Sequence, residues 1–289
     1  MAEMSARQRT GIFLASPAVI YLIALFAVPA VLLLVVSFYR SRAFMPIPDF
    51  VFDNYMRAIS SKGFWLVMWL SLRIGLATAF VSVAASFPVA WFIVYRSRSS
   101  MLLYLILASW LTSYLVRIYG WRMILGSNGF VNSTLQNSGL ISQPLEFLLY
   151  NPVSVVIALI HIYMPLTLLM LVSALRDVKP DYLEAARDLG AGSMATLFKV
   201  TIPMINRGLV SAFMFTLILA TGDYVTPQLL GGTNSTTVGL LISNQFRQTG
   251  NWPFGASLAF ITFAVFVAIY IVVVLSLRFA GLAPNRRYH

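Results

Sequence analysis

The sequence predicts an all-helical integral membrane protein with six transmembrane helices. Its 289 residues are 59% apolar and only 10% charged, which is far from the balance of a soluble globular domain. Six long stretches carry no charged residue, and a helix of about 20 residues crosses the hydrocarbon layer of a bilayer. A third observation is the polar segment 177–206, which lies between the fourth and fifth stretches and holds four of the nine acidic residues.

The six expected spans form a single transmembrane domain that covers residues 1–289. They lie at about residues 11–38, 64–95, 100–122, 150–175, 208–229 and 255–279. The first is too long for the apolar part of a cleavable signal peptide. Because six is an even number, both ends of the chain are expected on the same side of the membrane.

Lysine and arginine predict which side that is, since they are enriched in cytoplasmic segments. With the N-terminus inside, twelve basic residues fall on inner segments and seven on outer segments, and Arg73 lies in or near the second span. The inner residues are Arg7, Arg9, Arg96, Arg98, Arg176, Lys179, Arg187, Lys199, Arg207, Arg278, Arg286 and Arg287. The outer residues are Arg40, Arg42, Arg57, Lys62, Arg117, Arg122 and Arg247. Both termini and the segment 177–206 are therefore expected in the cytoplasm.

The composition also excludes several classes of chemistry. The chain has no cysteine, so it has no disulfide and no thiolate metal site, and we expect no metal site at all. None of the three lysines stands in a Walker A phosphate loop, so any ATP that drives this protein must be hydrolysed by another subunit. The net charge of +11 is expected to serve contacts with anionic membrane lipid. No aromatic residues interleave a basic stripe, so nucleic acid is not expected as a partner.

The segment 177–206 predicts two short helices that fold back on each other. Pro180 suits the first turn of a helix, where its missing N–H has no partner to lose. Gly190 supplies a left-handed stop for that helix. Ser193 is expected to cap a second helix through Lys199, and Pro203 is expected to end it. Such a compact polar element could be bound by a cytosolic partner.

The same segment resembles the EAA motif in the membrane subunits of ABC importers. The matching residues are Glu184-Ala185-Ala186, then Gly190, then Pro203 at the end of Val-Thr-Ile-Pro, where the family prefers Ile and Leu at two positions. The resemblance implies the type I ABC importer permease architecture and a loop that docks on an ATPase subunit. The residues it implies for coupling are Glu184, Ala185, Ala186, Arg187, Asp188, Leu189, Gly190 and Pro203.

Three further segments, 113–121, 222–232 and 251–256, resemble the first permease of spermidine/putrescine-type importers. This likeness runs through nearly the whole chain. It implies a permease of the bacterial inner membrane that forms half of a pore and works by alternating access. The implied partners are a second homologous permease, an ATPase dimer that binds ATP and Mg, and an extracytoplasmic substrate-binding protein. This chain itself would hold no cofactor.

An acid and a group of aromatic residues are the candidates for a substrate pathway. Asp223 lies within the fifth predicted span, where an ionisable group is a functional candidate by default. Trp110 and Tyr114 are four residues apart, so on one helix they would share a face that could hold a ligand ammonium. Tyr224 and Arg117 complete the candidate set.

Structural roles compete with each of these assignments. Asp223 could form a structural pair with Arg73 or Arg117, or could face water at the mouth of a cavity. The aromatic residues could belong to an interfacial belt or pack between spans.

The resemblance predicts import of a polyamine such as putrescine or spermidine, and other readings remain open. Relatives with similar segments carry opines, amino acids and other small solutes. A secondary carrier would run on an ion gradient without nucleotide. A membrane scaffold protein could use the same cytoplasmic element without any transport.

Overall fold

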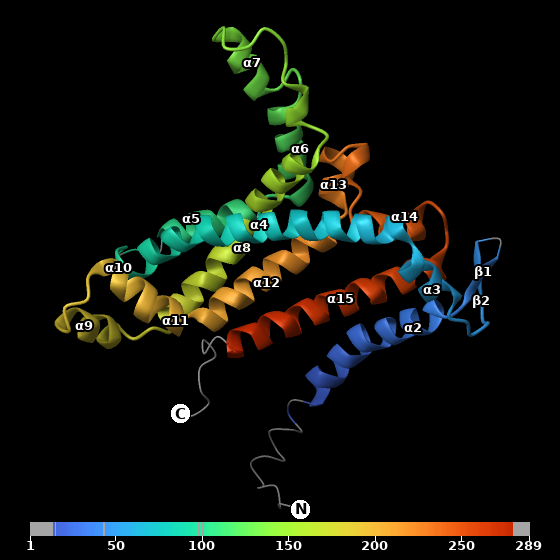
Figure 1. Cartoon of the computed structure of the whole chain (residues 1–289), viewed down its shortest axis with the longest axis horizontal. Coiled ribbons are helices and arrows are strands. Elements are labelled where there is room, and N and C mark those ends of the chain that lie inside the picture. Colours follow the sequence, from blue (N-terminus) through green and yellow to red (C-terminus); the bar gives the residue numbers. More distant parts are fainter. Residues whose placement is uncertain (1–13, 15, 43, 98, 100, 280–289) are drawn as a thin grey trace, which may run out of the picture. The chain divides into compact units, whose positions relative to one another are not determined.

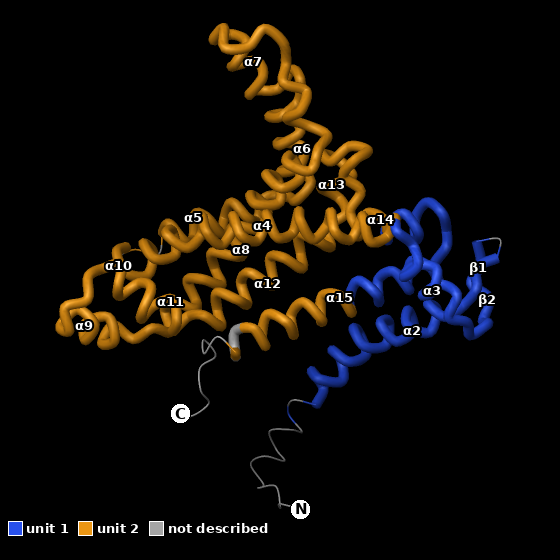
Figure 2. The backbone as a smooth tube through the Cα atoms, viewed as in Figure 1, with its two compact units in different colours: residues 1–62, 242–263 blue, residues 63–241, 264–289 orange. Residues whose placement is uncertain are grey.

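The computed structural model describes residues 14, 16–42, 44–97, 99 and 101–279. The start of the first predicted span, both termini and Arg7, Arg9, Arg98, Arg286 and Arg287 lie outside the described residues, as does the side chain of Arg278. Helices dominate the described chain (Figure 1), as the sequence predicts. They fall into two compact units, residues 1–62 with 242–263 and residues 63–241 with 264–289 (Figure 2).

The first unit contains an apolar helical run and a small hairpin. The run Ser16–Ser37 includes a π-helical part, Ile23–Ala27, and helix α2, Val28–Ser37. Strands β1, Arg40–Arg42, and β2, Met45–Ile47, pair antiparallel, and helix α3, Asp53–Ser60, follows them. The Arg40 guanidinium lies 3.2 Å from carboxylate oxygens of both Asp49 and Asp53. Strands of three residues show too little alternation to be predicted, so the hairpin is an addition to the expected all-helical chain.

The second unit contains most of the helices. They are α4 Lys62–Tyr95, α5 Met101–Trp110, α6 Tyr114–Leu125, α7 Phe130–Asn137, α8 Pro152–Arg176, α9 Pro180–Asp188, α10 Ser193–Thr196, α11 Ile202–Met204, α12 Asn206–Gly222 and α13 Val225–Leu230. Short 3₁₀ turns occur at Glu146–Leu148 and Thr233–Ser235, and a π-helical turn at Leu197–Thr201. Helices α14, Val238–Arg247, and α15, Trp252–Phe279, contain residues of both units.

Helix α8 is the centre of the second unit, and it packs along α12. Its buried side chains include Leu159, Ile162, Leu168 and Leu171, each at most 2% exposed. Asn151 begins the helix with a capping box, in which its side-chain oxygen accepts from the backbone N–H of Ser154 at 3.1 Å. This well-packed and capped helix is the frame against which the functional residues are placed.

Helices α4 and α12 approach each other closely at Gly75. A Cβ atom on Gly75 would lie 2.1 Å from the hydroxyl oxygen of Thr221 and 3.1 Å from the carbonyl oxygen of Leu217. Small residues at such crossings let helices in membranes pack by van der Waals contact and short polar contacts. Gly75 therefore fixes how near α12 lies to α4.

Four helices are long and apolar enough to cross a membrane: Ser16–Ser37, Lys62–Tyr95, Pro152–Arg176 and Trp252–Ser276. The number rises to six if each of two bent pairs forms one span. The pairs are Met101–Trp110 with Tyr114–Asn137, bent by 86°, and Ser193–Met204 with Asn206–Gly222, bent by 71°. The predicted fold class is confirmed, and the predicted limits of the single transmembrane domain stay a prediction.

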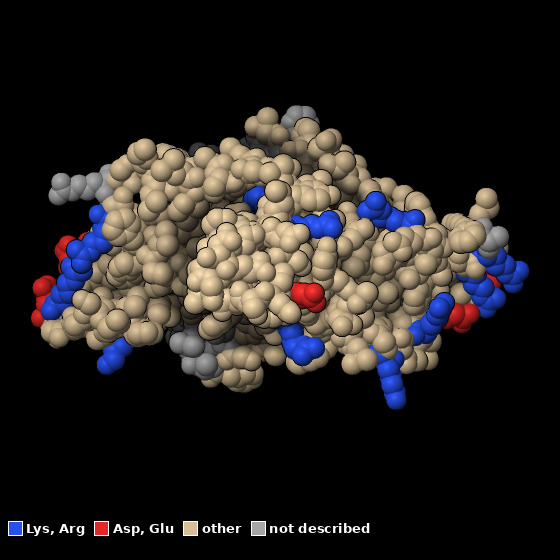
Figure 3. Space-filling model, turned by 90° about the horizontal axis from the view of Figure 1, so that it is seen from above, with Lys and Arg blue, Asp and Glu red and all other residues tan. Residues whose placement is uncertain are grey.

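The surface is consistent with a lipid environment. Large apolar side chains such as Phe80 on α4 and Phe263 on α15 are 69% and 64% exposed. In the face shown in Figure 3, acidic and basic side chains stand in small groups separated by broad areas without charge. Exposed apolar area on this scale marks contact with membrane or with other proteins.

Candidate functional site

Residues 177–206, called the coupling segment after the role predicted for them, begin with the helix and glycine stop that the sequence predicts. Helix α9 starts at Pro180 in its first turn and ends just before Gly190, whose φ is +81°. The N–H of Gly190 donates to the carbonyl of Arg187 at 2.8 Å, and the N–H of Ala191 donates to the carbonyl of Ala186 at 2.9 Å. These two bonds form a Schellman motif, in which glycine takes the left-handed position without steric cost.

The second half of the coupling segment differs from the prediction. Ser193 is the first helical residue of α10 rather than its cap, because Gly192 takes the N-cap position. Pro203 does not end the helical run, which passes through the π-helical turn and continues as α11 to Met204. Proline is tolerated there because it lies in the first turn of α11, where no α-helical bond needs its N–H. The expected closure at Pro203 is therefore wrong.

Most of the predicted coupling residues face outward. Leu183 is buried, whereas Glu184, Ala185, Arg187 and Asp188 are exposed and Ala186 and Pro203 are partly buried. Leu189 is 89% exposed, and Met194 on α10 is 71% exposed. Polar and apolar side chains are thus available together on one compact element.

The second candidate site is the break between α12 and α13, where Asp223 lies. The carboxylate accepts hydrogen bonds from the Tyr114 hydroxyl, from the Tyr163 hydroxyl at 3.1 Å and from the backbone N–H of Thr226 at 2.9 Å. Because the single proton of Tyr114 goes to Asp223, the Thr226 hydroxyl donates to the Tyr114 oxygen at 2.9 Å. Asp223 is only 8% exposed, so these contacts replace its hydration.

These contacts give Asp223 other structural partners than the arginines considered from the sequence. Among the described residues, the Asp223 side chain contacts two tyrosine hydroxyls and a backbone N–H rather than Arg73 or Arg117. Its burial also contradicts a mouth position that faces water. The acid instead connects α6, α8 and the α12–α13 break through one carboxylate.

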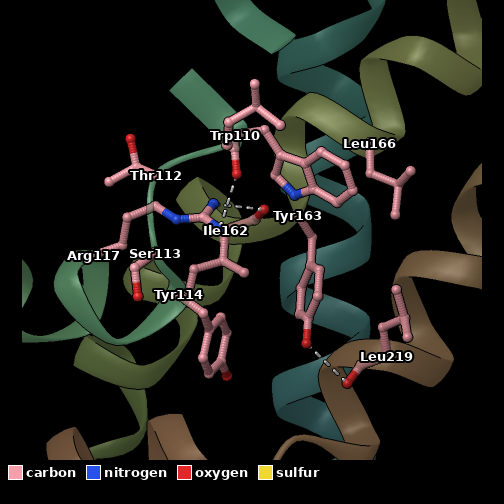
Figure 4. A pocket seen from close by; sticks show the side chains of 10 residues that line it. Trp110, Thr112, Ser113, Tyr114, Arg117, Ile162, Tyr163, Leu166 and Leu219 are labelled. Carbon is pink, nitrogen blue, oxygen red and sulfur yellow. Dashed lines mark hydrogen bonds between the residues drawn. The ribbon is translucent and has the colours of Figure 1, made fainter. Parts of the chain in front are cut away.

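Trp110 and Tyr114 do not share a helix face, contrary to the prediction. Trp110 ends α5 and Tyr114 begins α6, because Ser113 adopts extended backbone angles of −51° and 135° between them. The four-residue spacing fails since it assumes one continuous helix. The break nevertheless places both side chains on the wall of one pocket (Figure 4).

This pocket, called the solute pocket below because it is the candidate site for a transported solute, has a volume of about 560 Å³. The lining residues are Trp110, Leu111, Thr112, Ser113, Tyr114, Arg117, Ile162, Tyr163, Leu166 and Leu219. The Arg117 guanidinium donates to the carbonyl oxygens of Ile162 at 3.3 Å and Trp110 at 3.5 Å. Arg117 thus links α6 to α8 and to the end of α5 while its charge lies at the pocket wall. Volumes of several hundred Å³ are typical of small-molecule sites.

Tyr224 is placed apart from these groups. It is 38% exposed, and the residues that line the pocket do not include it.

Sequence reasoning also missed Tyr163 and Thr226, which complete the contacts of Asp223. Tyr163 is 60 residues from Asp223, so no local pattern could identify it. Thr226 is only three residues after Asp223, a spacing at which an Asp side chain can accept a backbone N–H at the start of a helix. Among the described residues, no group of three or more His, Cys, Asp or Glu side chains could hold a metal ion.

The whole chain has a clear place among known sequences. Residues 4–287 match the family described as binding-protein-dependent transport system inner membrane component. The chain belongs to this family. It is therefore a membrane permease subunit of an ABC importer, a transport component rather than an enzyme.

Named relatives are similar over most of the chain. The chain is 30% identical to the spermidine/putrescine transport system permease protein PotB of Escherichia coli K12, covering 78% of this chain and 81% of that protein. It is also 30% identical to PotB of Haemophilus influenzae, covering 88% of each. It is 26% identical to the inner membrane ABC transporter permease protein YdcU of Escherichia coli K12, covering 78% of this chain and 76% of that protein.

A solved structure confirms the fold. A chain of a bacterial ABC transporter involved in the import of the acidic polysaccharide alginate superimposes with a TM-score of 0.70. Its sequence is 16% identical, and the match covers 94% of this chain and 96% of the other. The predicted type I permease architecture is therefore correct.

Proposed function

We propose that this permease imports a small organic amine of the polyamine class and that its coupling segment transmits the motion of a separate ATPase dimer. The partners are a second homologous permease, the ATPase dimer, which binds ATP and Mg, and an extracytoplasmic substrate-binding protein. The complex lies in the bacterial inner membrane, with both termini and the coupling segment in the cytoplasm. The two permeases form the pore, which works by alternating access.

The exposed coupling segment is the observation that carries this proposal. Glu184 offers a polar contact, the small side chains of Ala185 and Ala186 allow close approach, and Leu189 offers apolar area that is 89% exposed. Arg187 and Asp188 add charges on the same short helix. Gly190 fixes the turn that ends α9, and Pro203 lies within α11.

A cross-linking experiment tests the coupling role. The chain has no cysteine, so a single Leu189→Cys substitution labels the segment without further changes. In the assembled complex in inverted membrane vesicles, a bifunctional thiol reagent should join this residue to the ATPase subunit, and nucleotide should alter the yield. The matched control is Ser127→Cys, an exposed residue after α6, which should give no such product. Equal products from both variants would contradict the proposal.

The polyamine class is supported by the two PotB proteins at 30% identity. It is also supported by the aromatic side chains of Trp110, Tyr114 and Tyr163 on the wall of the solute pocket. Aromatic faces attract organic ammonium groups, by about 0.5–2 kcal/mol for each contact.

Uptake by the complete reconstituted complex tests the substrate class. Labelled putrescine and spermidine should enter proteoliposomes only when ATP is present, and a neutral polyol should not compete. An inactivated ATPase subunit should abolish uptake, whereas uptake that persists on an ion gradient would show a secondary carrier. Failure of both amines to enter would reject the polyamine class.

A further inference from the structure

The charge of the solute pocket differs from what a purely cationic solute requires. Among the ten residues that line the pocket, Arg117 is the one charged side chain, and none is acidic. Figure 4 shows Arg117 reaching from α6 toward Trp110 and Tyr163. An ammonium group beside this guanidinium would be repelled.

Asp223 is not itself part of the pocket wall. Its carboxylate already accepts three hydrogen bonds and is 8% exposed. The Tyr114 hydroxyl donates to Asp223, and the Tyr163 hydroxyl donates to Asp223 at 3.1 Å and to the Leu219 carbonyl at 3.4 Å. A solute in the pocket therefore meets the aromatic rings and Arg117 before it could meet the acid.

Arg117 retains hydrogen-bonding capacity for a ligand. A guanidinium has five N–H donors, and the two bonds to carbonyl oxygens are long, at 3.3 and 3.5 Å. Its Nε has no partner in the structure and is buried. Among the described residues, no carboxylate lies within ion-pair distance of Arg117. Arginine in this state is suited to bind a carboxylate or phosphate through paired N–H groups.

The N-terminus of α6, at the break between α5 and α6, favours an anionic ligand as Arg117 does. Helix α6 begins at Tyr114, and its N-cap residue Ser113 makes no side-chain capping bond. The first N–H groups of a helix without a cap carry a partial positive charge. Broken helices in transporters bind anionic groups of substrates at such ends. Here the end of the helix and Arg117 belong to the same pocket.

We propose that the solute pocket binds an anionic oxygen group, the carboxylate of the transported solute, through Arg117. This inference rests on the proposed import function but changes the expected solute from a polyamine to an amine that also carries a carboxylate. The ammonium end would lie against the aromatic rings and the carboxylate end against Arg117. The phosphate of a membrane lipid offers similar oxygen atoms, and the experiment separates the two sources.

A charge-sensitive labelling experiment tests the site without relying on transport. Thr112→Cys places a single thiol on the pocket wall of a chain that otherwise has none. In the complete complex, the rate at which this thiol is labelled is measured with an anionic and with a cationic methanethiosulfonate. Each rate is divided by the labelling rate of Ser127→Cys with the same reagent. Adding Arg117→Gln should lower the anionic-to-cationic ratio about tenfold, because one nearby charge acts on the two reagents in opposite directions.

Arg122→Gln is the matched control, since Arg122 is exposed and its guanidinium contacts Tyr150 instead of the pocket. It should leave the ratio unchanged. A ratio that does not respond to Arg117→Gln, or a thiol that neither reagent reaches, would overturn the proposal. An equal response to both arginine substitutions would also overturn it.

Protection of the same thiol identifies the bound group. Putrescine and 4-aminobutyrate each have four carbon atoms and one common ammonium end. The other end is a second aminomethyl group in putrescine and a carboxylate in 4-aminobutyrate. 4-Aminobutyrate should slow labelling of Thr112→Cys more than putrescine does, and Arg117→Gln should remove the difference. Protection that follows the phosphatidylglycerol content of nanodiscs and ignores 4-aminobutyrate would assign the site to lipid and overturn the proposal.

Uptake separates this inference from the proposed function. If putrescine enters and putrescine protects better than 4-aminobutyrate, the amine importer stands and the carboxylate site fails. If neither amine enters but 4-aminobutyrate protects through Arg117, the carboxylate site stands and the polyamine class fails.

Discussion

The coupling segment and the Asp223 break both interrupt the long helices, but the first is mostly exposed and the second is buried. In the coupling segment, α9 buries only Leu183, and its turn at Gly190 is held by backbone hydrogen bonds within six residues. At the Asp223 break, one buried carboxylate accepts bonds from side chains 109 and 60 residues away. The first interruption is self-contained and presents a surface, whereas the second depends on the packing of three helices.

This difference separates two kinds of role. A self-contained and exposed turn can move as a body when a partner binds, since few contacts with the rest of the unit need to break. A buried acid with three hydrogen bonds resists movement, because each lost bond leaves an uncompensated polar group. We therefore expect substitutions at the first to affect transport and substitutions at the second to affect stability.

The largest expected effect is at Gly190. Gly190→Val forces a β-branched side chain to a φ of +81°, which costs about 1–2 kcal/mol and reorients α9. ATP-driven uptake by the reconstituted complex should fall about a hundredfold while the subunit still inserts.

Gly192→Val is the control for this substitution. Gly192 has an ordinary φ of −68°, and at both glycines a Cβ atom would meet no other atom within 4 Å. Uptake by this variant should stay within about twofold of the wild type, since no left-handed conformation is disturbed. Normal uptake and ATPase stimulation in Gly190→Val would contradict the coupling role.

The second effect, at Asp223, is on stability. Asp223→Ala removes the acceptor of three hydrogen bonds and leaves the Tyr163 hydroxyl only its longer bond to the Leu219 carbonyl at 3.4 Å, so the free energy of unfolding should fall by about 3 kcal/mol. Asp223→Asn keeps one acceptor oxygen and should lose less. Denaturation of the purified complex in lipid nanodiscs measures both, and unchanged stability in Asp223→Ala would mean that the acid is not a structural link.

The smallest of the three effects is at Gly75. Gly75→Ala would place a methyl group against Thr221 and push α12 away from α4, at a cost of about 1–2 kcal/mol. Gly120→Ala is the control, because nothing lies within 4 Å of a Cβ atom there. The same denaturation assay should show a loss for the first variant only. Equal stability would indicate that the two helices separate without cost.

What the sequence can predict follows the same division. The helix at Pro180 and the stop at Gly190 are predictable because proline and glycine act on backbone angles within a few residues. The contact of Asp223 with Tyr163 is not, since no local pattern encodes a pair 60 residues apart.

The prediction for Trp110 and Tyr114 fails for a local reason. A four-residue spacing suggests one face for Trp110 and Tyr114, but Ser113 breaks the helix between them. Both residues still line one pocket, because α5 and α6 each pack against α8. The family likeness predicts the fold because it draws on the whole chain rather than on any one spacing.

The π-helical turn at Leu197–Thr201 has a consequence for the geometry of the coupling segment. Such a turn contains one residue more than an α-helical turn, and each helical residue adds about 100° of rotation about the axis. The extra residue thus sets the direction, around the helix axis, in which the exposed side chains of α10 point. Deleting one residue from Leu197–Lys199 would keep Glu184, Gly190 and Pro203 but would shorten the Gly190–Pro203 spacing and turn that surface in a new direction.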